Sequence, residues 1–192
     1  MLKTKKLPLN FKFLRFFLIP AFLFSSPLLN NIQDVKAALE FQWDQDSGYR
    51  RLKWLQLENK KRFRNKIYFF FRPSDRKTDL LKINLAIPKP FKSKLIQDKI
   101  SLCKVRIGGF ENRTKCLEDI PADIEINTDE STSLRSINIY PYKPLPKSKE
   151  SYAIVLKVFN PKKSGLYQFH SYGQPKGESV SSYLGSWTIV ID

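Results

Sequence analysis

The chain has 192 residues and carries 34 Lys and Arg against 18 Asp and Glu, which gives a formal net charge of +16 at pH 7. Less a targeting segment, this length makes one domain of ordinary size that can bury a real core, so it excludes a chain of several domains. The surface is strongly basic, and anionic partners are therefore expected.

The N-terminus has the parts of a secretory signal peptide. Five Lys and Arg precede an apolar stretch at residues 16–24, and Val35-Lys36-Ala37 offers a cleavage site after Ala37. This stretch is too short for a membrane-spanning helix, which takes about twenty residues. We expect residues 1–37 to direct export by the general secretory route, to the periplasm, the thylakoid lumen or the medium, with an uncleaved anchor as the alternative. Residues 38–192 then form the exported domain, whose 28 Lys and Arg and 17 Asp and Glu leave a charge of +11.

Short apolar segments, rich in β-branched and aromatic residues, recur along the exported part with Pro, Gly and Asn between them. They predict strands at residues 39–43, 51–57, 66–72, 81–87, 101–107, 123–127, 137–140, 152–159, 166–172 and 183–191. One short helix is expected over residues 91–97, where Phe91, Leu95 and Ile96 form an apolar face. The pattern predicts an all-β fold, an antiparallel two-layer sandwich of immunoglobulin-like type with one short helix.

The segment at residues 152–159 is nearly continuous in hydrophobicity, which is typical of a central strand covered on both faces. Asn160-Pro161 and Gly165 supply turn residues after it, so we expect it to form an antiparallel hairpin with the return strand. The spacing Gly165-Leu166-Tyr167-Gln168-Phe169 resembles the tyrosine corner of immunoglobulin-type sandwiches.

Cys103 and Cys116 are the two cysteines of the chain, and an exported protein meets an oxidising compartment. The loop that starts at Gly108-Gly109 is long enough to bring Cys116 back beside Cys103, so we expect a disulfide that stabilises the fold by about 3 kcal/mol. A redox or metal pair is the disfavoured alternative, because such cysteines usually lie a few residues apart and need further ligands.

Positive charge is concentrated between residues 50 and 77, where eleven Lys and Arg face only Glu58 and Asp75, and six aromatic residues are interleaved. We expect this stretch, folded as a hairpin with its loop at residues 58–65, to bind an anionic polymer or lipid surface. The alternative is a solvated hairpin whose aromatic residues belong to the core. Nucleic acid is not the expected partner, since no recognition motif is present. The candidate binding residues are Arg50, Arg51, Lys53, Lys60, Lys61, Arg62, Arg64, Lys66, Arg72, Arg76 and Lys77.

No motif in the sequence names a reaction. His170 is the single histidine and has no partner readable from sequence, so a structural role is expected. Six acidic residues between positions 118 and 130 lack the spacing of a known calcium loop. We therefore expect no enzyme activity, no metal and no cofactor. An enzyme acting on an envelope polymer and a membrane-tethered structural protein are the alternatives.

Several short motifs, in this order, resemble those of an uncharacterised cyanobacterial family of exported proteins, the domain of unknown function 2808. They are Asp75-Arg76-Lys77-Thr78, Ile87-Pro88, Asn160-Pro161, Gly165-Leu166-Tyr167-Gln168-Phe169, Gly173-Gln174-Pro175 and Tyr183-Leu184-Gly185-Ser186-Trp187. The resemblance covers most of the exported part. It implies export and a β-rich domain, and it implies no catalytic residues.

Overall fold

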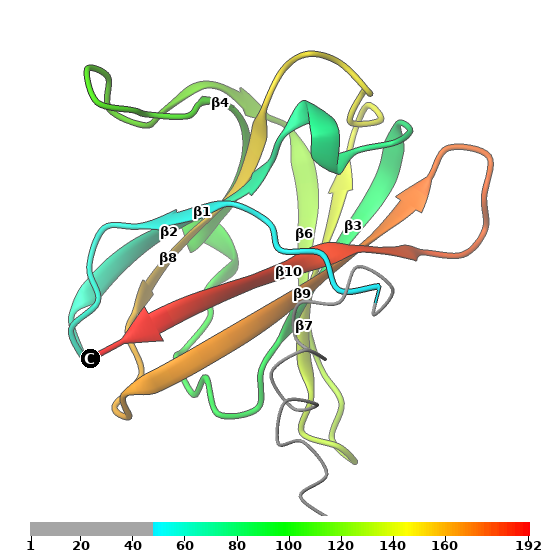
Figure 1. The fold of residues 1–192 in the computed structure, drawn as a ribbon. Coiled ribbons are helices and arrows are strands. Elements are labelled where there is room, and N and C mark those ends of the chain that lie inside the picture. The colour runs from blue at the N-terminus through cyan, green and yellow to red at the C-terminus, as the bar shows by residue number, and fades with distance from the viewer. Residues whose placement is uncertain (1–47) are drawn as a thin grey trace, which may run out of the picture. The chain divides into compact units, whose positions relative to one another are not determined.

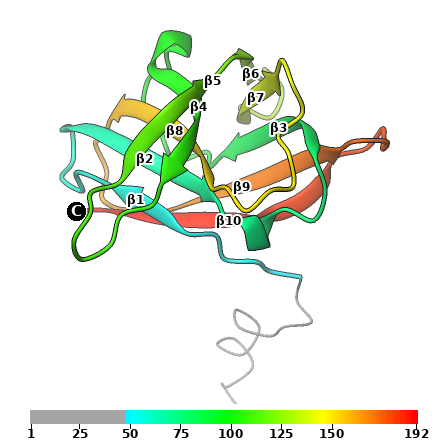
Figure 2. The same cartoon turned by 90° about the horizontal axis from the view of Figure 1, so that it is seen from above.

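A computed structural model describes residues 48–192, which form two five-stranded antiparallel sheets packed face to face (Figures 1 and 2). The strand order is β1-β2-β8-β4-β5 in one sheet and β10-β9-β3-β7-β6 in the other. The strands are β1 (Trp54–Gln56), β2 (Arg64–Phe71), β3 (Leu80–Ile87), β4 (Ile100–Arg106), β5 (Lys115–Ile120), β6 (Ala122–Thr128), β7 (Arg135–Pro141), β8 (Tyr152–Phe159), β9 (Gly165–Pro175) and β10 (Ser182–Ile191). The predicted antiparallel two-layer sandwich is therefore confirmed.

The expected strands from residue 51 onward are all present, that at residues 152–159 with the expected ends and the others with shifted ones, and β5 is an additional strand that the pattern did not reveal. Its sequence Lys-Cys-Leu-Glu-Asp-Ile has mostly exposed side chains, because β5 lies at the edge of its sheet. An edge strand without a buried face leaves little hydrophobic periodicity to read. The expected strand at residues 39–43 and the expected signal peptide at residues 1–37 lie outside the described residues.

The expected hairpin of β8 with β9 is wrong. β8 lies between β2 and β4, whereas β9 lies in the opposite sheet between β10 and β3. Residues 160–164 instead carry the chain from one sheet to the other, across a separation of about 10 Å. The hydrophobic continuity of β8 was interpreted correctly, because Leu156 faces the space between the sheets and Val155 is buried on the outer face.

The helix expected over residues 91–97 is also wrong. Residues 91–96 have no regular secondary structure, and a single 3-10 turn follows at Gln97–Lys99. Phe91 is fully buried between the sheets, where its ring meets those of Tyr167 and Phe169 edge-on at centroid distances of 5.4 and 5.0 Å. Tertiary packing of this one ring has overridden the local apolar spacing. A second 3-10 turn lies at Pro73–Asp75.

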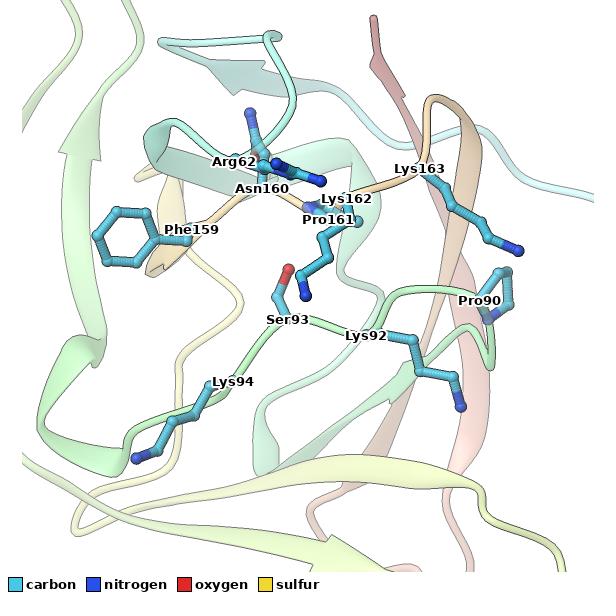
Figure 3. Close-up of a pocket in the computed structure, with 10 residues that line it drawn as sticks. All are labelled: Arg62, Pro90, Lys92, Ser93, Lys94, Phe159, Asn160, Pro161, Lys162 and Lys163. Atoms are coloured by element: carbon cyan, nitrogen blue, oxygen red, sulfur yellow. The ribbon is translucent and has the colours of Figure 1, made fainter.

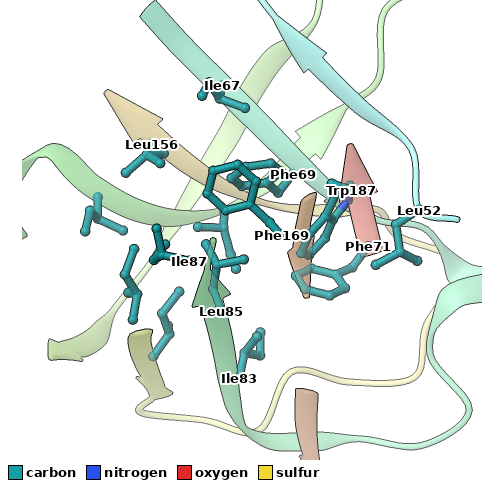
Figure 4. Close-up of a cluster of buried hydrophobic side chains, with 14 of the residues drawn as sticks. Leu52, Ile67, Phe69, Phe71, Ile83, Leu85, Ile87, Leu156, Phe169 and Trp187 are labelled. Atoms are coloured by element: carbon teal, nitrogen blue, oxygen red, sulfur yellow. The ribbon is translucent and has the colours of Figure 1, made fainter. Parts of the chain in front are cut away.

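A contiguous group of aromatic rings occupies the centre of the core (Figure 4). Trp187 of β10 packs on Phe69 and Phe71 of β2 at centroid distances of 4.8 and 5.2 Å, and its indole N–H donates to the carbonyl of Lys53. Phe69 also contacts Phe169, which links the two sheets through rings alone. Each buried aromatic side chain removes a large apolar area from water, so these rings hold the two layers together.

The tyrosine corner is present. The Tyr167 hydroxyl donates to the carbonyl of Lys163, four residues upstream, at 2.6 Å. This bond fixes the start of β9 immediately after the chain has crossed between the sheets, and it is a feature of immunoglobulin-type sandwiches. Burial of the phenol also raises the pKa of Tyr167 above its usual value.

The disulfide between Cys103 and Cys116 is confirmed, and it joins the neighbouring strands β4 and β5. It lies on the outer face of the sheet in a second apolar cluster, which also contains Tyr68, Phe70 and Val155. The covalent bond therefore holds the β4–β5 loop at residues 107–114 beside this cluster.

Replacing Phe91 with Ala should lower the free energy of unfolding by about 3–5 kcal/mol, because it empties a fully buried site between the sheets. Phe110 is the matched control, since its side chain is fully exposed at the tip of the β4–β5 loop. Phe110→Ala should change stability by less than about 0.5 kcal/mol. Urea denaturation followed by tryptophan fluorescence measures both values, and equal losses in the two variants would contradict the assigned burial.

Reducing the disulfide should lower the free energy of unfolding by about 3 kcal/mol, because the open chain regains the entropy of a loop that spans a sequence separation of 13. Denaturant unfolding with and without a phosphine reductant measures the difference. The Cys103→Ala/Cys116→Ala variant is the control, since the reductant should leave its stability unchanged. A wild type equally insensitive to reductant would show that the bond contributes nothing.

Candidate functional site

The structure divides the eleven candidate basic residues among four places rather than one continuous band. Four of them, Lys60, Lys61, Arg62 and Arg64, are exposed on or beside the β1–β2 loop. Arg51 and Lys53 are exposed at the other end of β1, where they surround Trp54 together with the half-buried Arg72 in a shallow cavity of about 370 Å³. Arg50, Arg76 and Lys77 lie near Asp75, and Lys66 lies on the outer face of β2 with its ammonium over the Tyr68 ring.

Asp75 neutralises part of the positive charge. This buried carboxylate forms ion pairs with Arg50 at 3.4 Å and Arg72 at 3.0 Å, and it also accepts the backbone N–H of Arg72 at 2.8 Å. The hydrogen bond that the Arg72 guanidinium donates to Asp75 raises the pKa of Arg72. Charges used within the protein in this way are less available to an external anion.

Arg76 is a structural residue. Its side chain is buried, and the guanidinium donates to the carbonyls of five residues, Phe71, Arg72, Pro146, Ser148 and Glu150. It also lies 4.6 Å from the centre of the Tyr152 ring. Burial lowers the pKa of Arg76 from its ordinary value. This guanidinium joins the residue 146–150 segment to β2 and is not exposed to a ligand.

Four of the six aromatic residues of the basic stretch are not available for stacking on a ligand. Tyr68, Phe69, Phe70 and Phe71 are all buried, on one face or the other of β2. Phe63 is exposed, with the Lys60 ammonium 5.9 Å from its ring centre. The stretch therefore supplies charge to the surface and rings to the core.

The β1–β2 loop is attached to the segment where the chain crosses between the sheets. The buried side chain of Asn160 donates to the carbonyls of Glu58 and Lys60 at 3.1 and 2.9 Å. Its amide oxygen accepts a hydrogen bond from Asn65 at 2.9 Å, and its backbone N–H donates to the carbonyl of Phe63 at 2.8 Å. Buried polar groups with every partner in place are rigid, so the two segments form one unit.

A third segment, residues 88–94, lies against this unit. Pro88 and Pro90 begin a turn in which the Phe91 N–H donates to the Pro88 carbonyl at 2.9 Å, and the buried Phe91 ring anchors it. Arg135 of β7 donates to the carbonyls of Phe91 and Ser93, the latter at 2.8 Å. The Arg135 guanidinium places a positive charge next to the Ser93 backbone. Its partial burial lowers the pKa of Arg135.

These three segments enclose a cavity of about 600 Å³, called the basic pocket below (Figure 3). Five of its ten lining residues are Lys or Arg and none is acidic; the lining comprises Arg62, Pro90, Lys92, Ser93, Lys94, Phe159, Asn160, Pro161, Lys162 and Lys163. Within the described part of the chain, no ion pair involves any of its five cations. The basic pocket therefore presents uncompensated positive charge around an apolar wall formed by Phe159 and two prolines.

Negative charge gathers at the opposite edge of the sandwich. Between Cys116 and Leu134 there are six carboxylates and no Lys or Arg. This stretch forms β5 and β6, which are the last strands of their sheets at one edge. β1 and β10 are the last strands at the other edge, where the side-chain amide of Gln56 donates to the carbonyl of Val190 at 2.7 Å.

His170 has a hydroxyl partner that sequence reasoning missed. Its Nδ1 lies 2.7 Å from the Ser186 hydroxyl, which in turn lies 2.6 Å from the Tyr183 hydroxyl. β9 and β10 bring the first two side chains into register. A nucleophilic serine needs contact with its substrate, but Ser186 is completely buried. The arrangement is a hydrogen-bonded structural chain across two strands.

Neither a metal cluster nor a membrane-spanning helix is found in residues 48–192. No three His, Cys, Asp or Glu side chains in this part of the chain are grouped to hold a metal ion. No helix in the same residues has the length and apolarity needed to cross a bilayer.

Residues 43–191 match the sequence pattern of a family described as protein of unknown function (DUF2808). The chain belongs to this family. The match confirms the resemblance inferred from the ordered motifs, and the family assigns no reaction or ligand. No curated protein sequence matches the chain.

Solved structures resemble the chain at low identity. The bacterial hydrophobin BslA is 12% identical with a TM-score of 0.43, over 74% of this chain and 97% of its own. The collagen-binding subdomain of the Enterococcus faecalis surface protein ACE is 10% identical with a TM-score of 0.40, over 74% and 97%. A collagen-binding domain from a Staphylococcus aureus adhesin is 11% identical with a TM-score of 0.37, over 73% and 95%. At these values the similarity carries no information on function.

Sequence reasoning missed four of the five cations of the basic pocket. Lys92, Lys94, Lys162 and Lys163 belong to two short loop segments whose local charge is too small to stand out along the chain. Each segment has two lysines shortly after a proline, Pro90 in one and Pro161 in the other. This pattern indicates a binding site only when the topology that brings the two segments together is known. The incorrect β8–β9 hairpin would have turned residues 160–164 into a simple connection and hidden that relation.

Replacing Arg76 with Ala should destabilise the protein by about 3 kcal/mol or more, since it leaves buried carbonyls without donors. Its neighbour Lys77 is the matched control, because it is exposed, and Lys77→Ala should change stability by less than about 0.5 kcal/mol. Thermal and urea unfolding measure both. If the two variants were equally stable, Arg76 would have to be returned to the candidate binding surface.

Proposed function

We propose that this protein is a non-catalytic module of the cell envelope that binds an anionic polymer through the basic pocket and the adjoining β1–β2 loop. The observation that carries the proposal is the convergence of three loop segments that place five cations around one cavity without a carboxylate among them. Lys60, Lys61 and Arg64 extend the same positive surface along the loop. Export by the secretory route, as expected from residues 1–37, would bring the protein to the envelope.

Electrostatic attraction alone can hold a charged polymer at such a site, without any catalytic residue. Each exposed ammonium or guanidinium gives a screened attraction to a charged polymer, and several cations on one surface add their effects. The rigid attachment through Asn160 keeps the loop cations together, so little conformational entropy is lost on binding.

Enzymatic action on an envelope polymer is the second candidate, and the arrangement around His170 weighs against it. The buried Ser186 hydroxyl occupies the Nδ1 side of the ring, and His170 does not line the basic pocket. The basic pocket also contains no carboxylate to act as a general acid or base.

Replacing Lys60, Lys61, Arg62 and Arg64 together with Ser should weaken binding to a polyanion roughly 100-fold or more at low salt, because each cation near an anionic surface contributes on the order of 1 kcal/mol. The four residues are exposed, so folding should be retained. Titrations of the purified protein with dextran sulfate, polygalacturonate and phosphatidylglycerol vesicles at two salt concentrations measure the effect.

The matched control removes the same charge elsewhere. Lys143, Lys147, Lys149 and Lys176 are exposed and do not line the basic pocket, and their replacement with Ser should change affinity by less than about three-fold. Equal losses in the two variants would mean that only net charge matters. Absence of binding at low salt would contradict the proposal. Binding to vesicles alone would identify the partner as a lipid surface in place of a polymer.

A further inference from the structure

Ser93 is the one polar side chain in the wall of the basic pocket that is buried without a hydrogen-bond partner in the described structure. The residue is 6% exposed, and its Oγ contacts no donor or acceptor. Asn160, the other buried polar residue of the wall, has every side-chain group engaged. Buried hydroxyls are normally paired, so an unpaired one that faces a cavity marks a place where a ligand atom can complete its bonding.

The surroundings of this hydroxyl define the charge of that ligand. In Figure 3 the Ser93 hydroxyl points toward the Lys162 side chain of the crossing segment, whereas Lys92, Lys94 and Lys163 line the rim of the cavity and extend outward from it. Arg135 adds a further positive charge beside the Ser93 carbonyl, at 2.8 Å. A hydroxyl that can donate, facing the Lys162 side chain in a cavity whose rim carries further lysines, favours an anionic acceptor.

The wall of the basic pocket also defines the size and shape of the ligand. A volume of about 600 Å³ is far larger than a single inorganic anion needs and is typical of sites for small organic molecules. Phe159, Pro90 and Pro161 supply apolar faces, which the C–H faces of a sugar ring can cover. The cavity therefore suits a ring that carries a negative substituent.

We propose that the basic pocket binds one anionic sugar residue of an acidic polysaccharide, with the Ser93 hydroxyl donating a hydrogen bond to its sulfate, phosphate or carboxylate group. This inference rests on the proposed function and names the class of polymer. Lys162 and the other cations neutralise the group, and the apolar wall packs on the ring. The cations outside the cavity, Lys60, Lys61 and Arg64, attract the charged groups of the neighbouring sugar units of the polymer.

The aromatic residues near the basic pocket favour a polysaccharide over a lipid bilayer. Phe63 and Phe159 are exposed, but Lys60 lies 5.9 Å from the first ring centre and the Arg64 guanidinium 5.4 Å from the second. Insertion of either ring among acyl chains would separate it from its cation or draw that cation out of water. A sugar chain lying along the surface disturbs neither contact.

The site is already formed before a ligand arrives. On one side of the cavity, hydrogen bonds from Arg135 hold residues 91–93 in place. On the other side, the hydrogen bond from Asn65 to Asn160 holds the crossing segment. The ligand therefore needs to order only the long lysine side chains, which keeps the entropic cost of binding small.

Ser93→Ala tests the inference directly, and Ser171→Ala is its matched control. Ser171 also has a fully buried hydroxyl without a partner, but it lies on β9 and does not line the basic pocket. Because both hydroxyls are unpaired in the free protein, neither substitution should impair folding. Ser93→Ala should weaken binding of dextran sulfate and polygalacturonate about ten-fold, as expected for a hydrogen bond to a charged group, and Ser171→Ala by less than two-fold.

A second measurement locates the ligand without any variant. Glucose 6-sulfate and galacturonate, titrated into the purified ¹⁵N-labelled protein, should shift the amide signals of Ser93 and Lys162, whereas glucose should leave them in place. Lys162→Ala should lower the affinity for the two anionic sugars, while Lys176→Ala should not.

The outcomes separate the two proposals. If polyanions bind with strong salt dependence and the β1–β2 loop variant loses that binding while Ser93→Ala does not, the sugar-binding inference is wrong and the proposed function stands. If no polyanion binds, both fail. If the wild type binds phosphatidylglycerol vesicles but neither polysaccharide, the assignment to a polysaccharide is overturned.

Discussion

The hydrogen bonds around Asn160 are the constraint on which the candidate site depends. At this residue the chain leaves one sheet for the other, and a single buried side chain joins the crossing segment to Glu58, Lys60 and Asn65. The β1–β2 loop is thereby fixed to the segment that leaves its own sheet for the other, and the turn held by Phe91 completes the enclosure. A surface assembled in this way has a defined geometry even though it consists almost entirely of loops.

The core and the charged surface draw on the same stretch of sequence. Between residues 64 and 72, β2 alternates so that Ile67, Phe69 and Phe71 fill the space between the sheets, while Tyr68 and Phe70 are buried beneath the outer face. Lys60, Lys61 and Arg62 lie in the loop before β2, and the cations that follow the strand include the buried Arg76. A mixture of aromatic and basic residues therefore does not imply stacking on a ligand. In this stretch the aromatic side chains of β2 are buried in the two apolar clusters, and most of the cations lie in the exposed segments on either side of the strand.

The fold class could be predicted from the sequence because alternate residues of each strand in a sandwich face the core. This regular burial leaves a period-two hydrophobic pattern in the sequence. Sequence reasoning identified β8 as a central strand from its hydrophobic run, and it paired Cys103 with Cys116 correctly. It failed where topology decides: a turn-like sequence at Asn160-Pro161 fits a hairpin and a crossing between sheets equally well. Because the basic pocket depends on that crossing, Lys162 and Ser93 could not be assigned to one site from local patterns.

The placement of charge on opposite edges gives the sandwich of residues 48–192 an electric dipole across its strands. Six carboxylates lie on or beside β5 and β6 at one edge, whereas the β1–β2 loop begins at the other. The field of a charged surface exerts a torque on such a dipole within roughly one Debye length, about 8–10 Å at physiological salt. If the protein binds a polyanion as proposed, it is therefore turned before contact, and its acidic edge faces away, where it repels a second polymer strand instead of cross-linking the two.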